Sequence, residues 1–194
     1  MAHRIPHLLL TALVAATATG CASTAARFYT LDATAKAGEA PAVRCAVVVG
    51  PVSVPASVDR PQIVVQVAPN RVDIDEFHRW ATPLYDGIAR VVASDLSVLL
   101  GTPDVGTALV SNSGPTYRVT IDIQRFESVQ DQAVLIEALW SVRGPAAGAV
   151  RPGHTLAREA VQGTGYEALA AAHSRALAQL SGEIAETIRA TATP

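Results

Sequence analysis

The acidic and imidazole side chains between residues 73 and 78 are the densest set of potential metal ligands in the sequence. Asp73, Asp75, Glu76 and His78 fall within this short segment. A hard cation would need several of these oxygens to converge from a loop. In an extended strand Asp73 and Asp75 would share one face, and acidic residues before a helix are favourable without any metal. We therefore expect a solvated segment here and no metal site.

Two histidines and one glycine turn are the other candidates for chemistry. His173 falls on the apolar stripe of a predicted C-terminal helix, where we expect a half-buried histidine at the edge of the core. His154 is expected in a loop. The turn at Gly163-Thr164-Gly165 lacks the lysine of a Walker motif and the third glycine of a dinucleotide fingerprint. These patterns indicate helix capping and core packing, with no catalytic residue and no cofactor.

Enzyme motifs of the common classes are missing from the sequence. There is no Gly-x-Ser-x-Gly elbow, no His-Glu-x-x-His, no Cys-x-x-Cys and no paired-carboxylate motif. A motif search of this kind does not exclude an enzyme. It favours a binding function over a catalytic one.

Cys21 is the residue whose position predicts a covalent modification. A basic start and an apolar run at residues 8–16 are followed by Ala18-Thr19-Gly20 and then the cysteine. These are the parts of a secretory signal, and the run is shorter than the about 20 apolar residues that span a bilayer. The arrangement resembles the bacterial lipobox, with Ala18 where leucine is usual. We predict a lipoprotein signal peptide at residues 1–20 and lipidation of Cys21; the alternative is cleavage near residues 16–18, which would leave Cys21 a free thiol.

The second cysteine and the charge balance narrow the class of protein further. Cys45 lies in the apolar run of residues 43–49, so we expect a buried, inert thiol. Without residues 1–20 the 15 basic residues lose Arg4, leaving 14 against 17 acidic residues and a net charge of −3. Lys36 is the single lysine, and the arginines are scattered. Nucleic-acid binding needs clustered basic residues, so no nucleic-acid partner is predicted.

The elements that must position these residues follow from hydrophobic periodicity. A helix over residues 83–100 would begin with Thr82 as N-cap and end at Gly101. A second helix would open with a capping box of Thr164 and Glu167. The alternating pattern of residues 117–124 slips at Arg125, which indicates a bulge or the end of a strand. Further strands are expected at residues 28–31, 43–54 with an interruption at Gly50-Pro51, 63–67, 71–74, 134–142 as a central strand, and 155–161.

Strands on both sides of one helix, followed by a closing helix, predict an α/β fold. We expect a single-domain sandwich with a mixed β-sheet and two long helices, covering residues 28–190. Residues 21–27 would form the lipidated cysteine and a short tether. From Cys21 to Phe28 the extended chain spans at most about 25 Å, so the domain would lie close to the lipid surface.

Several short motifs together resemble a known family. They are Gly50-Pro51-Val52, Asp59-Arg60-Pro61-Gln62-Ile63-Val64, Asn70-Arg71, Glu76-Phe77-His78-Arg79-Trp80 and Pro83-Leu84. With the lipobox ahead of them, the chain resembles the PqiC/YmbA-type ABC transport auxiliary lipoproteins. The resemblance runs from Cys21 to the last helix, and residues 59–84 are its most specific part.

The resemblance implies a location and a set of partners. It implies an α/β domain whose lipid anchor, such as palmitate, holds it on the periplasmic face of the Gram-negative outer membrane. Ala22 after the cysteine, in place of aspartate, favours that membrane by the lipoprotein sorting rule. The implied partners are an MCE-domain protein and the ABC permease and ATPase of an intermembrane lipid transporter, which supports membrane integrity. No catalytic residues carry over, and a homo-oligomer stays open.

The segment from residue 59 to residue 80 has two interpretations. Pro61 and Trp80 would have a structural role if the proline stiffens a turn and the indole covers the core. In the functional interpretation, the docking surface for a partner consists of Arg60, Gln62, His78, Arg79 and Trp80. The alternative function is a periplasmic carrier of a lipid or small hydrophobic ligand, which would need an apolar cavity of about a few hundred Å³.

Overall fold

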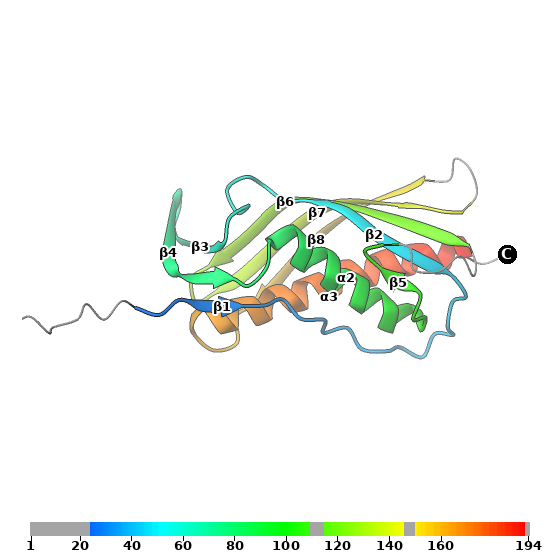
Figure 1. Ribbon diagram of the computed structural model, residues 1–194, viewed down its shortest axis with the longest axis horizontal. Helices are drawn as coiled ribbons and strands as arrows, with labels where there is room; N and C mark the ends of the chain where they lie inside the picture. The colour runs from blue at the N-terminus through cyan, green and yellow to red at the C-terminus, as the bar shows by residue number, and fades with distance from the viewer. Residues whose placement is uncertain (1–23, 109–114, 146–149, 193–194) are drawn as a thin grey trace, which may run out of the picture.

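The computed structural model describes residues 24–108, 115–145 and 150–192, which form two layers (Figure 1). One layer is an eight-stranded mixed sheet, and the other consists of two helices that pack on one of its faces. This confirms the predicted α/β sandwich. The elements are β1 (Arg27–Tyr29), β2 (Ala46–Ser53), β3 (Gln62–Ala68), β4 (Arg71–Trp80), α2 (Leu84–Leu100), β5 (Val105–Gly106), β6 (Thr116–Val129), β7 (Ala133–Arg143), β8 (Val150–Ala160) and α3 (Gly165–Ala192).

The long strand β6 organises the sheet. One edge of β6 pairs antiparallel with β7 along its length, and β7 pairs antiparallel with β8. The other edge pairs in parallel with β2 as far as Asp122, and then with β3 at the single position where Gln66 is opposite Val129. β4 pairs with β3, and the short β1 lies parallel to β4. The prediction of β7 as an inner strand is confirmed.

Alternating burial shows which face of the sheet carries the helices. In β7 the side chains of Val134, Ile136 and Ala138 are inaccessible to solvent, because they lie on the face that α3 covers. On the opposite face Leu139 is 48% exposed and Leu156 of β8 is 59% exposed. An antiparallel sheet with one packed face and one solvated face gives this alternation.

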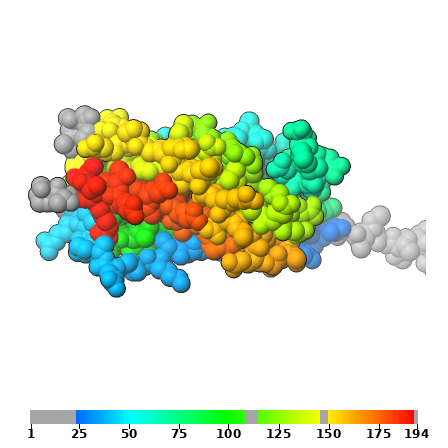
Figure 2. Space-filling view, turned by 180° about the vertical axis from the view of Figure 1, so that it is seen from behind, coloured from blue at the N-terminus to red at the C-terminus, as the bar shows by residue number. Residues whose placement is uncertain are grey.

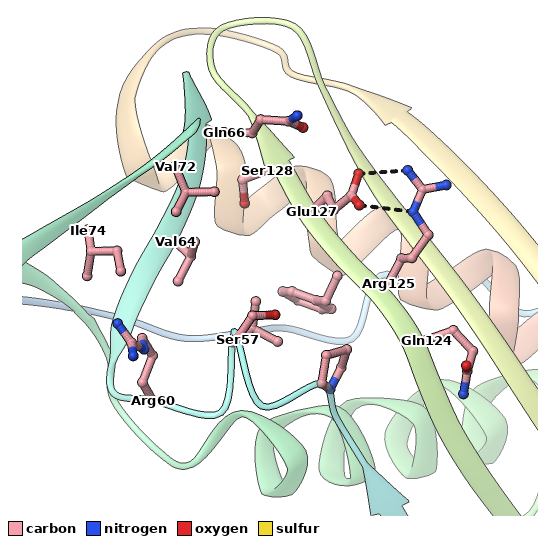
Figure 3. A pocket seen from close by; sticks show the side chains of 13 residues that line it. Ser57, Arg60, Val64, Gln66, Val72, Ile74, Gln124, Arg125, Glu127 and Ser128 are labelled. Atoms are coloured by element: carbon pink, nitrogen blue, oxygen red, sulfur yellow. Dashed lines mark hydrogen bonds and ion pairs between the residues drawn. The ribbon is translucent and has the colours of Figure 1, made fainter. Parts of the chain in front are cut away.

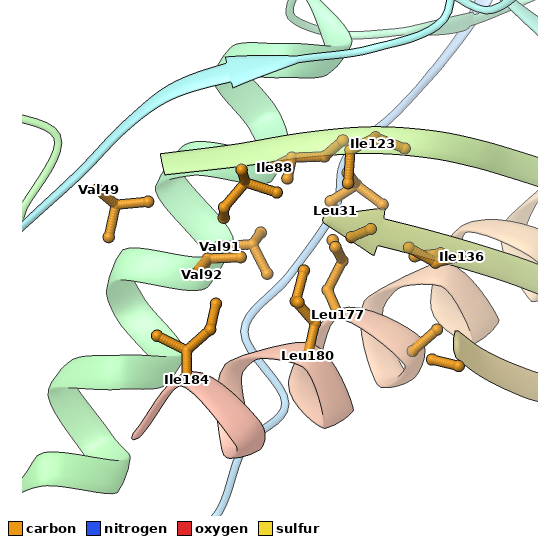
Figure 4. Close-up of a cluster of buried hydrophobic side chains, with 14 of the residues drawn as sticks. Leu31, Val49, Ile88, Val91, Val92, Ile123, Ile136, Leu177, Leu180 and Ile184 are labelled. Carbon is orange, nitrogen blue, oxygen red and sulfur yellow. The ribbon is translucent and has the colours of Figure 1, made fainter. Parts of the chain in front are cut away.

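The core fills the space between the sheet and the two helices (Figure 4). Ile88 and Val92 of α2 pack toward Leu177, Leu180 and Ile184 of α3 in a cluster that is closed to water. Full burial of each such side chain contributes about 1.5–3 kcal/mol to the free energy of unfolding. The predicted apolar stripes of both helices are the stripes that form this core.

The segment that follows β1 is packed against the helices although it has no regular structure. Residues 30–43 run along the lower side of the molecule, below α2 and α3 (Figures 1 and 2). Leu31 is 2% exposed and belongs to the core. The buried Asp95 of α2 accepts hydrogen bonds from the backbone N–H groups of Thr34 and Ala35. The Ser174 hydroxyl accepts the N–H of Asp32 at 3.1 Å, so two side chains replace a strand partner for this stretch of backbone.

Some element boundaries differ from the sequence predictions. Thr82 is not the N-cap of α2: Pro83 occupies that position with φ −48° and ψ 134°, and no side chain caps the helix. Gly101 ends the helix in the left-handed conformation at φ 65°, as predicted. The interruption at Gly50-Pro51 is a cis peptide bond beside a register shift within a continuous β2.

Two strands are longer than their hydrophobic patterns indicated. β4 does not end at Ile74 but continues to Trp80, where the Trp80 N–H donates to the carbonyl of Pro61 at 2.7 Å. β8 begins at Val150, so His154 lies in a strand and not in a loop. His154 also has a partner, Glu137 of β7, at 3.1 Å. In both strands backbone pairing extends past the apolar residues, which the side-chain pattern could not reveal.

Candidate functional site

The predicted docking residues lie at the end of the molecule formed by β3, β4 and the loop before β3. Gln62 and Arg79 are opposite one another in register. Both contact Glu76: the Gln62 amide donates to its carboxylate at 2.8 Å, and the Arg79 guanidinium donates to its backbone carbonyl at 2.7 Å. The side chains of Arg79 and Glu76 are 38% and 63% exposed. Together these three residues form a polar cluster that is open to solvent.

His78 and Trp80 point to the other face of β4. Nδ1 of His78 lies 2.6 Å from the hydroxyl of Tyr29, and its ring stacks on Tyr166 with 3.9 Å between centroids. The indole of Trp80 is 8% exposed and meets the ring of Phe126 edge-on at 6.2 Å. The structure thus places Gln62 and Arg79 in a solvated cluster, and the half-buried His78 and the buried Trp80 among aromatic rings on the other face. The burial of Trp80 matches the structural interpretation, and a docking role for these residues stays a prediction.

Neighbouring residues of a strand point to opposite faces, which places Arg79 on one face of β4 and His78 and Trp80 on the other. Next to them β4 has a wide irregularity. Gln62 is opposite Arg79 while Val64 is opposite Ile74, so β4 contributes three residues more than β3 between these points. Within the irregularity the Asp75 carboxylate accepts the N–H of Phe77 at 2.7 Å. The acidic side chain satisfies local backbone there, which is a common role of aspartate. Among the described residues, no group of three or more His, Cys, Asp or Glu side chains is arranged to hold a metal ion.

A groove of about 420 Å³ opens between β3 and β6 on the helix-free side of the sheet (Figure 3). We call it the β3–β6 groove. Arg60 is the one member of the predicted docking set that lines it. Its lining consists of Pro55, Ser57, Val58 and Arg60 from the loop, Val64 and Gln66 from β3, Val72 and Ile74 from β4, and residues 124–128 from β6.

The two arginines of the groove differ in charge compensation. Arg125 donates two hydrogen bonds of 2.9 Å to Glu127, and Glu137 lies 3.8 Å away (Figure 3). Arg60 is exposed, and among the described residues no hydrogen bond or ion pair joins its guanidinium to another residue, although its backbone N–H donates to the carbonyl of Val58 at 2.8 Å. The groove therefore has an apolar wall, a neutralised ion pair and one uncompensated positive charge.

A serine and a histidine meet beneath the groove, a pair that the sequence did not reveal. Ser128 Oγ lies 2.8 Å from Nε2 of His173, whose ring stacks on Phe126 at 3.9 Å. His173 is completely buried and not half-buried as expected, and desolvation lowers its pKa to about 3. Its Nδ1 has no hydrogen-bond partner in the described structure. The imidazole is thus a weak base without the orienting acid of a catalytic triad, so this pair is not arranged for nucleophilic catalysis.

The structure tests the prediction for one of the two cysteines and not for the other. Cys45 is a buried free thiol, and burial raises its pKa, which confirms the expected inert residue. Cys21 and the predicted signal peptide lie outside the described residues. The description begins at Thr24, shortly before β1. No helix in the described ranges is long and apolar enough to cross a membrane.

Comparison with known families bears directly on the resemblance found in the sequence. The family model for the ABC-type transport auxiliary lipoprotein component matches residues 29–185. The chain belongs to this family. The match extends from the end of β1 into the last turns of α3, and confirms the resemblance to the auxiliary lipoproteins. The family is a transport auxiliary component and is not an enzyme family.

Two solved structures have the same fold. A crystal structure of an uncharacterised protein matches with a TM-score of 0.69 and 22% identity, over 85% of this chain and 99% of that chain. Protein XCC0632 from Xanthomonas campestris, a member of the DUF330 family, matches with a TM-score of 0.66 and 21% identity, over 82% of this chain and 92% of its own. No curated protein matches the sequence. At this identity the neighbours inform on the fold alone.

Proposed function

We propose that this auxiliary lipoprotein works at the outer membrane, facing the periplasm, as a non-enzymatic component of an MCE/ABC-type intermembrane lipid transport system. Its role there is to dock the transporter and to support membrane integrity. The family match over residues 29–185 is the observation that carries the proposal. The family description implies association with an ABC transporter, and in the proposed system ATP hydrolysis belongs to another subunit.

The position of β1 supports a docking role close to a membrane. β1 begins at Arg27 and lies beside β4, at the same end of the molecule as the polar cluster of Gln62, Glu76 and Arg79 (Figure 1). From Cys21 to Arg27 the chain spans at most about 20 Å when extended. Lipidation of Cys21 would therefore keep this end near the bilayer, where a transporter that bridges two membranes must arrive.

The chemistry of two buried groups supports the proposal of a non-enzymatic role. The Ser128–His173 pair has a histidine with a pKa of about 3, which is a poor general base at neutral pH. The Cys45 thiol is buried and its pKa is raised, so little of the nucleophilic thiolate forms. Neither group offers an activated nucleophile.

The alternative function is a carrier of a lipid or small hydrophobic ligand. The observation that favours it is the β3–β6 groove, whose volume of about 420 Å³ falls in the range of ligand pockets. Mass spectrometry of lipids retained through purification separates the two functions. A stoichiometric lipid would support the carrier and contradict a pure docking role.

Co-purification is the experiment that tests the proposed function. The tagged full-length protein, extracted from membranes in a mild detergent, is expected to retain an MCE-domain protein or an ABC permease subunit. Cys21→Ser is expected to move the protein out of the membrane fraction and to lower this recovery. If the wild-type protein repeatedly comes out without any transporter subunit, the proposal is wrong.

A further inference from the structure

The β6 strand has an unoccupied edge inside the β3–β6 groove. Pairing of β6 with β2 ends where Asp122 is opposite Ser53. Pairing with β3 is confined to Val129 and Gln66. Between these points, residues 123–128 have β7 as their strand partner on one side, and residues 124–128 line the groove on the other.

Backbone groups at such an edge determine which ligand fits it. Every second residue of a strand directs its N–H and C=O toward the same edge, and these groups require hydrogen-bond partners. An acyl chain in the groove would cover them and leave them unpaired, at a cost in free energy. An extended peptide pairs them, as in recognition by strand addition.

The side chains of the groove suit an extended segment with apolar residues at alternate positions. Val64, Val72 and Ile74 stand along one side of the groove, opposite β6 (Figure 3). The side chain of Val72 is 54% exposed. Phe126 lies in the floor and is 5% exposed. A strand that presents every second side chain to this wall would bury Val72.

The charge of the groove indicates that its ligand carries a negative group. Arg60 stands at the end of the groove below Ile74 and has no ion pair among the described residues (Figure 3). Arg125 is already neutralised by Glu127 and Glu137. A guanidinium binds a carboxylate through two parallel hydrogen bonds. The groove thus matches an acidic residue or a terminal carboxylate at one end of the segment.

We propose that the β3–β6 groove binds an extended peptide segment of a partner protein by strand addition between β3 and β6, with alternate apolar side chains against Val72 and Ile74 and a carboxylate at Arg60. The inference rests on the proposed function only for the identity of the partner, a transporter subunit. The peptide test below examines the groove itself, so its failure leaves the co-purification result unaffected, and the reverse also holds.

The test uses a phage-displayed library of random twelve-residue peptides against the immobilised full-length protein in detergent. Enriched peptides are expected to alternate apolar residues, to carry an acidic residue, and to slow amide exchange of residues 123–128. Proline at alternate positions should abolish their binding, because proline has no N–H to donate. Arg60→Glu should weaken binding about tenfold or more, an effect that lysine in place of the peptide's acidic residue reverses.

Two variants complete the test. Val72→Asp changes an exposed side chain, so the fold is expected to tolerate it, and it should abolish binding. Arg90→Glu, at an exposed position on α2, should leave binding unchanged. The proposal is overturned if no peptide is enriched, or if the enriched peptides bind Val72→Asp as well as the wild type. It is also overturned if the fluorescent fatty acid cis-parinaric acid occupies the groove of the wild type but not of Val72→Asp, and peptides do not displace it.

Discussion

The carboxylate of Asp95 lies 2.9 Å from the backbone nitrogen of Ala35, which ties the segment after β1 to helix α2. The same oxygen accepts the N–H of Thr34 at 2.9 Å, and the other oxygen accepts the Ser181 hydroxyl of α3 at 3.3 Å. Asp95 is fully buried, and desolvation raises its pKa. One acidic side chain therefore joins both helices to the stretch of chain that leads toward Cys21.

Replacement of Asp95 should loosen this segment. Asp95→Ala leaves two backbone N–H groups without an acceptor, so we expect the free energy of unfolding to fall by about 2–3 kcal/mol. Asp95→Asn keeps an oxygen acceptor and should cost about 1 kcal/mol or less. Urea denaturation gives the stability, and amide exchange at residues 34 and 35 locates the change. Equal stability of the alanine variant and the wild type would contradict the assigned contact.

Substitution of Trp80 distinguishes a role in core packing from a role in docking. Because its indole is 8% exposed and packs on Phe126 and His173, Trp80→Ala should lower the free energy of unfolding by about 3–5 kcal/mol. Arg79→Ala, at a neighbouring but solvated position, should change it by less than about 0.5 kcal/mol. Denaturation of both variants is the measurement. A Trp80→Ala variant of wild-type stability would assign Trp80 to a surface role.

Gly153 provides the room in which Trp140 packs. A Cβ at Gly153 would overlap the six-membered ring of Trp140, whose indole N–H donates to Thr155 at 2.9 Å. Gly153→Ala should therefore displace the indole and lower the free energy of unfolding by about 1–3 kcal/mol or more. Gly182→Ala in α3, where a Cβ meets no atom within 4 Å, is the matched control and should stabilise by about 0.5–1 kcal/mol. Thermal unfolding of the two variants should shift in opposite directions.

His173 should make the fold sensitive to acid. Its pKa is about 3 in the folded protein and about 6.5 when unfolded, so the unfolded state binds more protons between these values. The contribution to stability is complete above about pH 6.5 and is lost as the pH falls toward 3, by about 1.4 kcal/mol per pH unit. Denaturation midpoints between pH 7 and pH 4 measure this slope.

The control for this slope is His173→Phe, which keeps an aromatic ring against Phe126 and does not titrate. Asp95, with its raised pKa, acts in the opposite direction: its contribution falls as the pH rises through that pKa. Asp95 is present in both proteins, so the difference between wild type and variant isolates His173. An identical pH dependence of the two proteins would refute the assignment.

The hydrophobic periodicity of the sequence was sufficient to predict the two helices and the inner strands of the sheet. The apolar stripe through Ile88 and Val92 and the alternation through Val119 and Ile121 are local patterns, and both became the core. The bulge expected near Arg125 is present as a register shift between Ile123 and Arg125. These features depend on residues that are only a few positions apart in the chain, so a single sequence is enough to predict them.

The groove and the buried histidine depend on contacts that are distant in sequence. β4 continues to Trp80 because its backbone pairs with β1 and β3, and no apolar pattern within residues 75–79 indicates this. His173 is buried because Phe126 and Ser128 of β6 cover it, 45 positions or more away in the chain. The unpaired edge of β6 follows from where β2 and β3 end their pairing. The hydrophobic pattern of a strand does not show with which residues of another strand it pairs, so this register could not be predicted from the sequence.

Site-specific photo-crosslinking in intact cells tests most directly whether this lipoprotein docks a transporter. p-Benzoylphenylalanine would replace Arg60 or Arg79 in the full-length protein, with replacement of the exposed Arg90 on α2 as the control. The account predicts adducts from the Arg60 and Arg79 positions with an MCE-domain or ABC permease subunit, identified by mass spectrometry, and none from position 90. Adducts with unrelated proteins alone, or no adduct from either position in a protein that still fractionates with membranes, would contradict it.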